Sequence, residues 1–295
     1  MTDTPLLAVR DLRASFPGPE GPVEVVHGVD LELARGEKVA LVGESGSGKS
    51  VTARAVLRLD AGATLTGRIA LDGTDLLTLP PRRMREIRGS GVGLVFQDPL
   101  ASLNPVMTIG WQIMQPLVIR GVSKKVARRR GVELLSRLGV RDAEQRFDDY
   151  PHQFSGGMRQ RVVIAIAIIA EPALLIADEP TTALDVRVQA QVLRLLHELA
   201  DERDMAVLLI THDLGIVAGF AERLVVMRHG LAVESGPVDE VYARPRHPYT
   251  RALLAAVPRI GGDLSRPLAT IGSATGEVAG EAAGEAAQEG TVSRA

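Results

Sequence analysis

The sequence lacks cysteine, contains few aromatic residues and has no large excess of either charge. The absence of cysteine from its 295 residues excludes disulfide scaffolds, thiol nucleophiles and cysteine-ligated metal centres. Aromatic residues make up only 3%, and 34 basic residues nearly balance 36 acidic ones. This balance excludes a nucleic-acid-binding protein that depends on overall positive charge.

The sequence also has no hydrophobic run long enough to cross a bilayer. The longest uncharged apolar run in the middle of the chain, residues 162–170, falls well short of the roughly 20 residues that a spanning helix needs. No basic segment followed by an apolar one is present at the N-terminus, so we expect no signal peptide. Any action at a membrane is therefore expected at its surface.

Short apolar runs alternate with helical patterns, which predicts an α/β fold with a mostly parallel sheet. Four buried strands are predicted, at 38–42, 92–96, 173–177 and 206–210. A helix is expected over 49–59, and another follows Asp185, which is placed to cap it. Two further strands, 6–12 and 23–33, are joined by a Pro/Gly-rich turn. Helical patterns with Gly and Pro interrupt the alternation between 98 and 154, which indicates an inserted subdomain.

A glycine-rich segment has the pattern of a phosphate-binding loop. It matches G-x-x-x-x-G-K-[ST] between a predicted strand and a predicted helix, as Gly43-Glu44-Ser45-Gly46-Ser47-Gly48-Lys49-Ser50. Glycines let backbone N–H groups approach an oxyanion, and the helix N-terminus adds partial positive charge. Lys49 can reach the β- and γ-phosphates, and Ser50 can bind Mg²⁺. A flexible Gly/Ser linker is the alternative, but the strand and helix on either side favour nucleotide binding.

Two carboxylates follow the strand predicted at 173–177. In P-loop enzymes an aspartate in the place of Asp178 holds Mg²⁺, and a carboxylate in the place of Glu179 can polarise an attacking water. A solvated pair of carboxylates at a helix cap is the alternative. Their position after a buried strand, downstream of a phosphate-binding loop, favours ATP hydrolysis.

A segment just before that strand resembles the signature motif, LSGGQ, of the ATPase subunits of ABC transporters. It reads Phe154-Ser155-Gly156-Gly157-Met158-Arg159-Gln160, so Phe and Met depart from the motif and its Ser-Gly-Gly centre is intact. A single nucleotide site does not need two phosphate-facing helix ends. The resemblance implies that two chains pair head to tail, each placing its signature on the ATP of the other.

Further positions match the same family and complete the implied site. Gln97 and His212 follow two of the predicted strands and resemble the family's Q-loop glutamine and H-loop histidine. Ala183-Leu184-Asp185 resembles the D-loop, and Phe16 stands where an adenine-stacking aromatic is expected, with a core phenylalanine as the alternative. The resemblance implies catalysis by Lys49, Glu179 and His212; ATP binding by Phe16, Gly43, Glu44, Ser45, Gly46, Ser47, Gly48, Lys49, Ser50, Val51 and Gln97; Mg²⁺ binding by Ser50, Gln97 and Asp178; and contacts in trans by Ser155, Gly156, Gly157 and Asp185.

Three segments are similar to the oligopeptide/dipeptide/nickel permease branch of this family. They are 96–105, the YPHQ sequence at 150–153, and the HPYTRALL sequence at 247–254. The pairing of GGMRQR with ADEPTTALD is most similar to the first of the two ATPases in such systems. Some members bind an iron–sulfur cluster through cysteines, which this sequence does not have.

The resemblance implies a P-loop NTPase core of RecA-like type, with an antiparallel β-subdomain and an inserted helical subdomain at about 98–160. We expect an ATPase domain over 1–245 and a C-terminal extension over 246–271. Residues 272–295 are rich in Gly, Ala and Glu. Their repeated glutamates would repel on a helix, so this part is predicted to be a disordered acidic tail.

The function implied by the resemblance is the ATP-hydrolysing subunit of an importer for oligopeptides or dipeptides. The expected partners are a second ATPase subunit (a paralogue, or a copy of this chain), two integral-membrane permease subunits and, indirectly, an extracytoplasmic solute-binding protein. The expected location is the cytoplasmic face of the cell membrane, as a peripheral subunit. No nucleic-acid partner is expected.

Two alternatives remain open from the sequence. One is a soluble ATPase of the same type acting on nucleic acid, on ribosomes or in cofactor assembly; the short spacing between Lys49 and Ser155 and the absence of a heptad run argue against the chromosome and repair type. The basic cluster within 124–130 has a solvated helix face as its ordinary explanation. The other alternative is a nucleotide switch without hydrolysis, against which the intact pair at 178–179 argues.

Overall fold

The structure is a computed structural model, and it describes residues 4–181 and 184–256. The chain divides into two units, 1–244 and 245–295. The predicted tail at 272–295 and most of the predicted extension at 246–271 lie outside the described residues. In the second unit the structure describes α11 (Pro248–Ala255), where the side chain of His247 accepts a hydrogen bond from the N–H of Tyr249.

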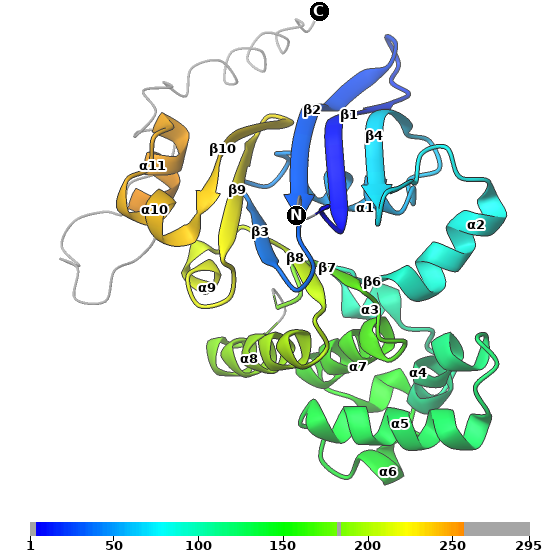
Figure 1. The fold of residues 1–295 in the computed structure, drawn as a ribbon. Coiled ribbons are helices and arrows are strands. Elements are labelled where there is room, and N and C mark those ends of the chain that lie inside the picture. The colour runs from blue at the N-terminus through cyan, green and yellow to red at the C-terminus, as the bar shows by residue number, and fades with distance from the viewer. Residues whose placement is uncertain (1–3, 182–183, 257–295) are drawn as a thin grey trace, which may run out of the picture. The chain divides into compact units, whose positions relative to one another are not determined.

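A six-stranded sheet forms the centre of the first unit, in the order β10-β9-β3-β8-β7-β6 (Figure 1). All neighbouring pairs are parallel except β9 and β10, which are antiparallel. The strands are β3 (Lys38–Val42), β6 (Val92–Val95), β7 (Leu174–Asp178), β8 (Ala206–Thr211), β9 (Arg223–Arg228) and β10 (Leu231–Pro237). Strands β3, β7 and β8 are buried along their whole length, as continuous apolar runs predict. The predicted mostly parallel sheet is therefore confirmed.

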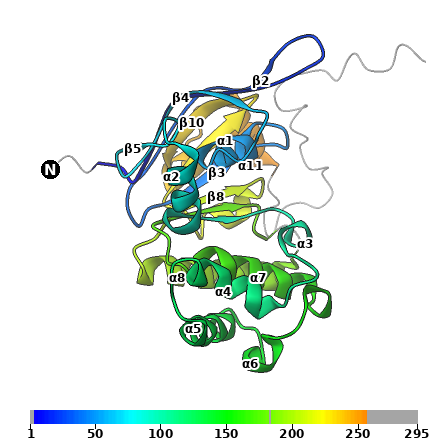
Figure 2. The ribbon, with the colours of Figure 1, turned by 90° about the vertical axis from the view of Figure 1, so that its right-hand side faces the viewer.

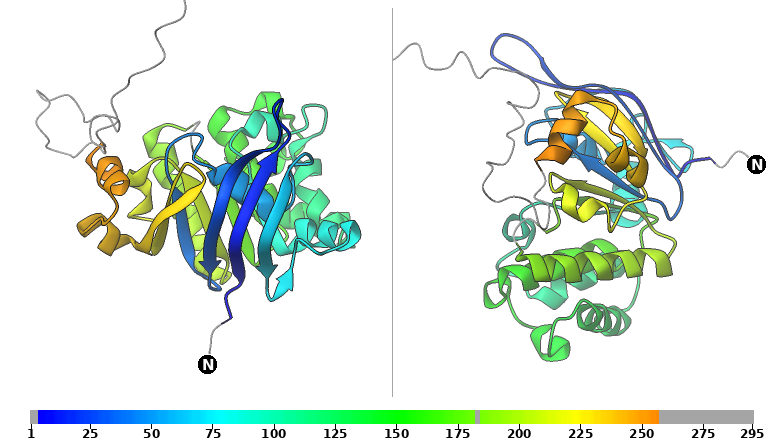
Figure 3. Two further views of the ribbon diagram at one scale, coloured as in Figure 1. Left: turned by 90° about the horizontal axis from the view of Figure 1, so that it is seen from above. Right: turned by 90° about the vertical axis from the view of Figure 1, so that its left-hand side faces the viewer.

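A four-stranded antiparallel sheet, in the order β2-β1-β4-β5, covers this core (Figure 3). Its strands are β1 (Leu7–Phe16), β2 (Val23–Leu33), β4 (Thr64–Leu71) and β5 (Thr74–Asp75). One buried apolar cluster joins the two sheets through helix α1 (Lys49–Val56). The helix ends before the predicted 59 because Leu57 is its C-cap and Arg58 has a φ of 49°, outside the helical region.

The remaining helices of the first unit form a layer on the other side of the parallel sheet and short connections around it (Figures 1 and 2). The helical layer contains α3 (Pro99–Ser102), α4 (Ile109–Val118), α5 (Lys124–Arg137), α6 (Ala143–Arg146), the 3₁₀ turn η2 (Pro151–Gln153), α7 (Gly156–Ile168) and α8 (Val186–Glu202). The connections are α2 (Pro81–Glu86), the π-helical turn η1 (Ile87–Gly91), α9 (Leu214–Val217) and α10 (Val238–Ala243). Helix α7 runs across the predicted subdomain boundary at 160. Among the described residues, no helix combines the length and the apolar character that crossing a membrane requires.

Candidate functional site

The glycine-rich loop connects β3 to α1, as its motif predicts. Gly48 is the N-cap of α1 and has a φ of 96°, a backbone conformation that residues with a side chain rarely adopt. At the start of the loop, a Cβ on Gly43 would lie 2.2 Å from the carbonyl oxygen of Met227. Glycine is therefore required at both positions by backbone geometry.

Lys49 is anchored inside this loop. Its Nζ donates hydrogen bonds to the carbonyl oxygens of Gly43 (2.8 Å) and Glu44 (2.6 Å). The side chain is buried, and this desolvation lowers the pKa of Lys49, while the nearby carboxylates of Glu179 and Asp178 act in the opposite direction. The loop therefore holds a buried ammonium group whose lost hydration the protein replaces only in part.

Ser50 and Asp178 come from opposite parts of the sequence and meet at the carboxyl end of β7. The Ser50 hydroxyl donates a hydrogen bond of 2.9 Å to Asp178 Oδ1. Asp178 is 5% exposed, and burial raises its pKa, with the hydrogen bond from Ser50 opposing the shift. The pair places a hydroxyl and a buried carboxylate beside the N-terminus of α1.

Glu179 is held between residues that follow the two strands on either side of β7. Its Oε2 accepts a hydrogen bond from Gln97 Nε2 (2.9 Å), and its Oε1 lies 3.0 Å from Nδ1 of His212. Its own backbone has a φ of 47°, and its N–H donates to the carbonyl of Ile210 at 2.9 Å. The structure thus brings Gln97, Glu179 and His212 together from the ends of β6, β7 and β8.

The residues of the signature-like segment lie at the start of α7. Ser155 is its N-cap, and its Oγ accepts a hydrogen bond from the N–H of Met158 at 3.4 Å. Ser155 and Gly156 are exposed, and a Cβ on Gly156 would meet nothing within 4 Å. Within the described part of the chain, no hydrogen bond connects Ser155, Gly156 or Gly157 to the loop at 43–50, so their contact with ATP in trans stays a prediction. Phe154 is instead a core residue, 2% exposed, next to Arg146.

Asp185 and Phe16 occupy the predicted places in the chain without contacting the groups described above. The carboxylate of Asp185 caps α8 by accepting hydrogen bonds from the N–H groups of Arg187 and Val188. Of the D-loop-like segment, Ala183 lies outside the described residues. Phe16 is half-buried at the end of β1, opposite Val23 of β2. Its stacking on adenine stays a prediction.

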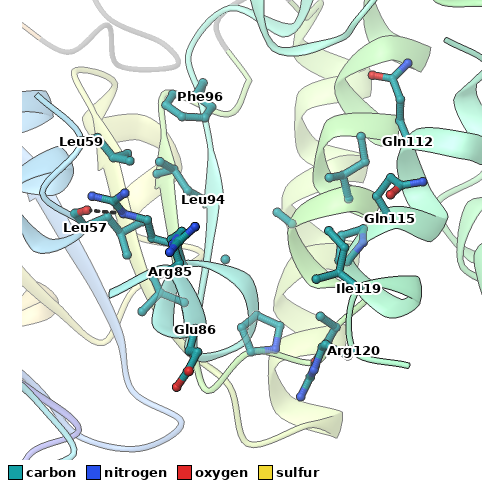
Figure 4. A pocket seen from close by; sticks show the side chains of 18 of the residues that line it. Leu57, Leu59, Arg85, Glu86, Leu94, Phe96, Gln112, Gln115, Ile119 and Arg120 are labelled. Carbon is teal, nitrogen blue, oxygen red and sulfur yellow. Dashed lines mark hydrogen bonds between the residues drawn. The ribbon is translucent and has the colours of Figure 1, made fainter. Parts of the chain in front are cut away.

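A cavity of about 840 Å³ lies between the parallel sheet and the helical layer, and the sequence did not predict it. Figure 4 shows Leu94 and Phe96 on one side of the cavity, with Gln115 of α4 and Ile119, its C-cap, on the other. Phe96, which follows β6 because that strand ends one residue earlier than predicted, is 42% exposed, and Ile119 is 80% exposed. Sequence reasoning could not find this cavity, because its lining comes from segments that are far apart in the chain.

Two family descriptions match the sequence. The family described as "ABC transporter" matches residues 26–182, and the family described as "Oligopeptide/dipeptide transporter, C-terminal region" matches residues 233–284. A protein of Brucella abortus (strain 2308), named as a peptide import ATP-binding protein, is 51% identical over 265 residues, which cover 89% of this chain and 80% of that protein. The oligopeptide transport ATP-binding protein OppD of Bacillus subtilis (strain 168) is 48% identical over 91% of this chain and 76% of its own length.

Solved structures with this fold are also ATP-binding cassettes. The dimeric cassette MJ0796, described in a post-hydrolysis state bound to ADP and Pi, has a TM-score of 0.72 and 29% identity, and the match covers 79% of this chain and 98% of that chain. The cassette cbiO1 of Clostridium perfringens, described as part of the ABC transporter complex cbiONQ, has a TM-score of 0.70 and 28% identity over 81% of this chain and 91% of that chain. The predicted fold class and family resemblance are therefore confirmed.

Proposed function

The chain belongs to the ABC transporter family, and from this premise we propose that it is the ATP-hydrolysing subunit of a peptide importer. The observation that carries the proposal is the convergence of Lys49, the Ser50–Asp178 pair and Glu179 around one phosphate-binding loop. The names of the relatives at about 50% identity refer to peptide import and oligopeptide transport. They do not favour the alternative of a soluble ATPase acting on nucleic acid or in cofactor assembly.

The loop at 43–50 binds the phosphates of ATP in this proposal. Its backbone N–H groups and the N-terminus of α1 supply partial positive charge, and Lys49 supplies a full one. Lys49 exchanges its hydrogen bonds to the carbonyls of Gly43 and Glu44 for the β- and γ-phosphate oxygens. A triphosphate also supplies the negative charge that a buried ammonium needs.

The residues at the end of β7 fit a magnesium ion. Mg²⁺ prefers oxygen ligands and keeps several waters, and it is usually held by one or two protein groups together with substrate phosphates. The Ser50 hydroxyl and the buried Asp178 carboxylate are such groups, 2.9 Å apart, and Gln97 follows the adjacent strand. No cluster of three or more acidic or histidine ligands exists in the described part of the chain. Phosphate oxygens and water would supply the remaining ligands of a bound Mg²⁺. When bound, the ion neutralises charge on the phosphate oxygens.

Glu179 orients the attacking water, and His212 and Lys49 stabilise charge on the transferred phosphoryl group. The carboxylate lies at the end of β7 next to Asp178, and only 14% of its side chain is exposed. Gln97 and His212 contact its two oxygens, so these residues set the direction in which the carboxylate points. A carboxylate held at a phosphate site acts as a general base or water-positioning group.

A second ATPase subunit completes the site in this proposal. The exposed Ser155 and Gly156 and the N-terminus of α7 face the ATP of that subunit, and Asp185 reports across the same interface. The partner is a paralogue or a second copy of this chain. In this proposal residues of two chains hold each ATP, and hydrolysis releases the two subunits from each other.

Two permease subunits in the membrane receive the resulting motion, and an extracytoplasmic solute-binding protein delivers the peptide to them. The cavity between the parallel sheet and the helical layer is the proposed docking site for a permease segment. It is lined by apolar groups such as Leu94, Phe96 and Ile119 and borders directly on the strand that precedes Gln97. In this proposal the chain is a peripheral subunit on the cytoplasmic face of the membrane.

The variant Glu179→Gln tests the hydrolytic role. We expect it to bind ATP with unchanged affinity and to lose turnover by about 10²–10⁴-fold, because the amide cannot act as a base. ATP binding is measured by calorimetry, and turnover by phosphate release. Glu198→Gln, at an exposed position of α8, is the matched control and keeps normal turnover. Near-normal ATPase activity of Glu179→Gln would show that the assignment is wrong.

A further inference from the structure

The phosphate-binding loop lies against the turn between β9 and β10, and we infer that Gly230 in this turn is a positioning residue for the amide of Gly48. The inference deepens the proposed function, because it rests on ATP binding at the loop. In the sequence, Gly230 lies far from the loop motif, near the other end of the ATPase core. It reaches the loop only through the tertiary structure, because β9 is the parallel neighbour of β3.

Two backbone hydrogen bonds connect Gly230 to the loop and to β2. Its N–H donates to the carbonyl of Ser47 at 3.1 Å, and its own carbonyl accepts from the N–H of His27 at 2.8 Å. The turn is therefore held on one side by the antiparallel sheet and contacts the loop on the other. Both ends of the connection are backbone groups, so the distance between loop and turn is set without any flexible side chain.

Both positions at this contact favour glycine, for different reasons. Gly230 has a φ of 74°, and a Cβ there would lie 2.4 Å from the carbonyl oxygen of Val25 and 2.4 Å from Cδ2 of His27. A Cβ on Gly48 would lie 3.5 Å from Cα of Gly230 and 3.2 Å from the same Val25 oxygen. Only glycine therefore fits at position 230, where a Cβ would clash with β2, whereas at position 48 glycine is favoured by the left-handed φ of 96°.

The hydrogen bond from Gly230 determines which way the next loop amide points. Ser47 and Gly48 share one peptide plane, and no peptide in the described part of the chain is cis. In a trans peptide the C=O and the following N–H point in opposite directions. Because the Ser47 carbonyl points to the turn, the N–H of Gly48 points away from it, to the side of the loop where a phosphate would bind.

The same hairpin also supports the beginning of the loop. The carbonyl of Met227, three residues before Gly230, lies where a Cβ of Gly43 would be, and the Met227 side chain is fully buried beside Thr52 of α1. The end of β9 and its turn therefore form a rigid support under both ends of the loop. Without the Gly230 bond, the Ser47–Gly48 peptide can rotate, and a phosphate-facing donor is lost.

Gly230→Ala tests the inference, with Gly73→Ala as its matched control. Gly73, in the β4–β5 turn, has a φ of 78°, so both variants force alanine into the same backbone conformation, but a Cβ at Gly73 meets nothing within 4 Å. We expect Gly230→Ala to bind ADP about tenfold more weakly, or worse, because a hydrogen bond to a charged group is lost. Gly73→Ala is expected to bind like the wild type. Calorimetry with ADP measures both, and circular dichroism reports folding.

Two further measurements separate orientation of the amide from a general loss of structure. In ¹⁵N-labelled protein, addition of ADP should shift the Gly48 amide resonance strongly in the wild type and weakly in Gly230→Ala. If Gly230→Ala does not fold, glycolic acid at position 230 replaces only the N–H by an ester oxygen, and the same tenfold loss is expected. A folded variant of either kind that binds ADP like the wild type overturns the inference. Failure of the wild type to bind ADP would instead contradict the proposed function.

Discussion

At the scale of single residues, the site holds charges that are costly to bury. Asp178 is nearly inaccessible and Lys49 is buried in the loop, so desolvation raises the pKa of the first and lowers the pKa of the second. Both shifts mean that the charged form is less stable in the folded protein than in the unfolded chain. In the nucleotide-free protein, burial of these two charged groups therefore lowers the free energy of unfolding. Both groups belong to the proposed phosphate and metal site.

Asp178→Asn should stabilise the nucleotide-free protein while abolishing Mg²⁺-dependent ATP hydrolysis. The amide oxygen still accepts the hydrogen bond from Ser50, and the buried charge is gone. We expect a gain of about 0.5–2 kcal/mol, as is common where a strained functional residue is replaced. Thermal unfolding without nucleotide measures the gain, and phosphate release measures activity.

The pH dependence of that gain distinguishes a charge effect from a packing effect. Because the folded pKa of Asp178 lies above its unfolded value, the destabilisation is absent at acid pH below the unfolded pKa. It grows as the pH rises through the folded pKa and is constant above it. Asp72→Asn, at an exposed carboxylate paired with Arg35, is the control and should change stability by less than about 0.5 kcal/mol. A gain that is independent of pH would contradict this explanation.

At the scale of elements, Phe147 organises the helical layer. Its ring is fully buried and contacts both α4 and α5 at glycines: a Cβ on Gly110 would lie 2.0 Å from the ring, and one on Gly131 would lie 2.8 Å from it. The guanidinium of Arg128 lies 5.0 Å from the ring centroid. The ring can therefore pack this closely against both helices only because these positions lack a side chain.

Gly131→Ala should destabilise the helical layer by about 1–3 kcal/mol, because the added methyl group overpacks the contact with Phe147. In an exposed part of a helix the same change would stabilise by up to about 1 kcal/mol. The sign of the effect therefore tests the packing. Trp111, the single tryptophan of the sequence, lies in α4, so its fluorescence during urea unfolding reports on this layer.

Two variants control this measurement. Ser136→Ala, at an exposed position of the same helix α5, should change stability by less than about 0.5 kcal/mol. Adding Phe147→Leu to Gly131→Ala frees space beside the new methyl group, so the two changes should be less harmful together than their sum. If the losses of stability from the two changes were additive, the new methyl group at position 131 would not be in contact with the Phe147 ring.

At the scale of the whole molecule, the parallel sheet and the helical layer are joined around a cavity that opens to the surface. Its apolar lining includes Phe96, which directly precedes Gln97, and Gln97 contacts Glu179. A partner segment in the cavity would therefore contact Phe96, the neighbour in sequence of Gln97, which holds the proposed catalytic carboxylate of Glu179. If the proposed docking is correct, this arrangement gives a short physical route from the docked segment to the proposed catalytic carboxylate.

Ile119→Asp should abolish co-purification with membrane subunits from detergent-solubilised membranes of the source organism. The side chain is 80% exposed and lines the cavity, so a charge there opposes docking of an apolar segment and has little effect on folding. The ATPase activity of the isolated subunit should not change. The measurements are affinity purification of the tagged chain and phosphate release.

Val23→Asp is the control for this surface. Val23 is 55% exposed at the start of β2 and does not line the cavity, so the variant should keep its membrane partners. Loss of the partners in both variants would indicate a general effect of the new charge. Unchanged co-purification of Ile119→Asp would exclude the cavity as the docking site.

Much of the fold and of the site could be predicted from local sequence. The motif at 43–50 predicts a strand before the loop and a helix after it, because its glycines and Lys49 bind phosphate only in that setting. The structure has this arrangement. The apolar run before Asp178 forms a buried parallel strand, as predicted. Element ends were less predictable: β6 ends before Phe96, and α1 ends before Leu57.

The aromatic residues show what a motif does not determine. Phe154 is the first residue of the signature-like segment, but its side chain is packed in the core with Arg146 beside it. Phe96 lines the cavity. Position next to a motif in the sequence does not determine which way a side chain faces, because that depends on elements from elsewhere in the chain.

The sequence by itself determined the chemistry of this protein: the glycine-rich loop with Lys49 and Ser50, and the carboxylates after a buried strand. These depend on residue type and short spacing, which local backbone geometry converts directly into structure. Only the tertiary structure decided that Glu179 lies between Gln97 and His212, that the loop contacts Gly230, and that a cavity opens beside Phe96. These features join segments far apart in the chain, and strand order and packing bring them together.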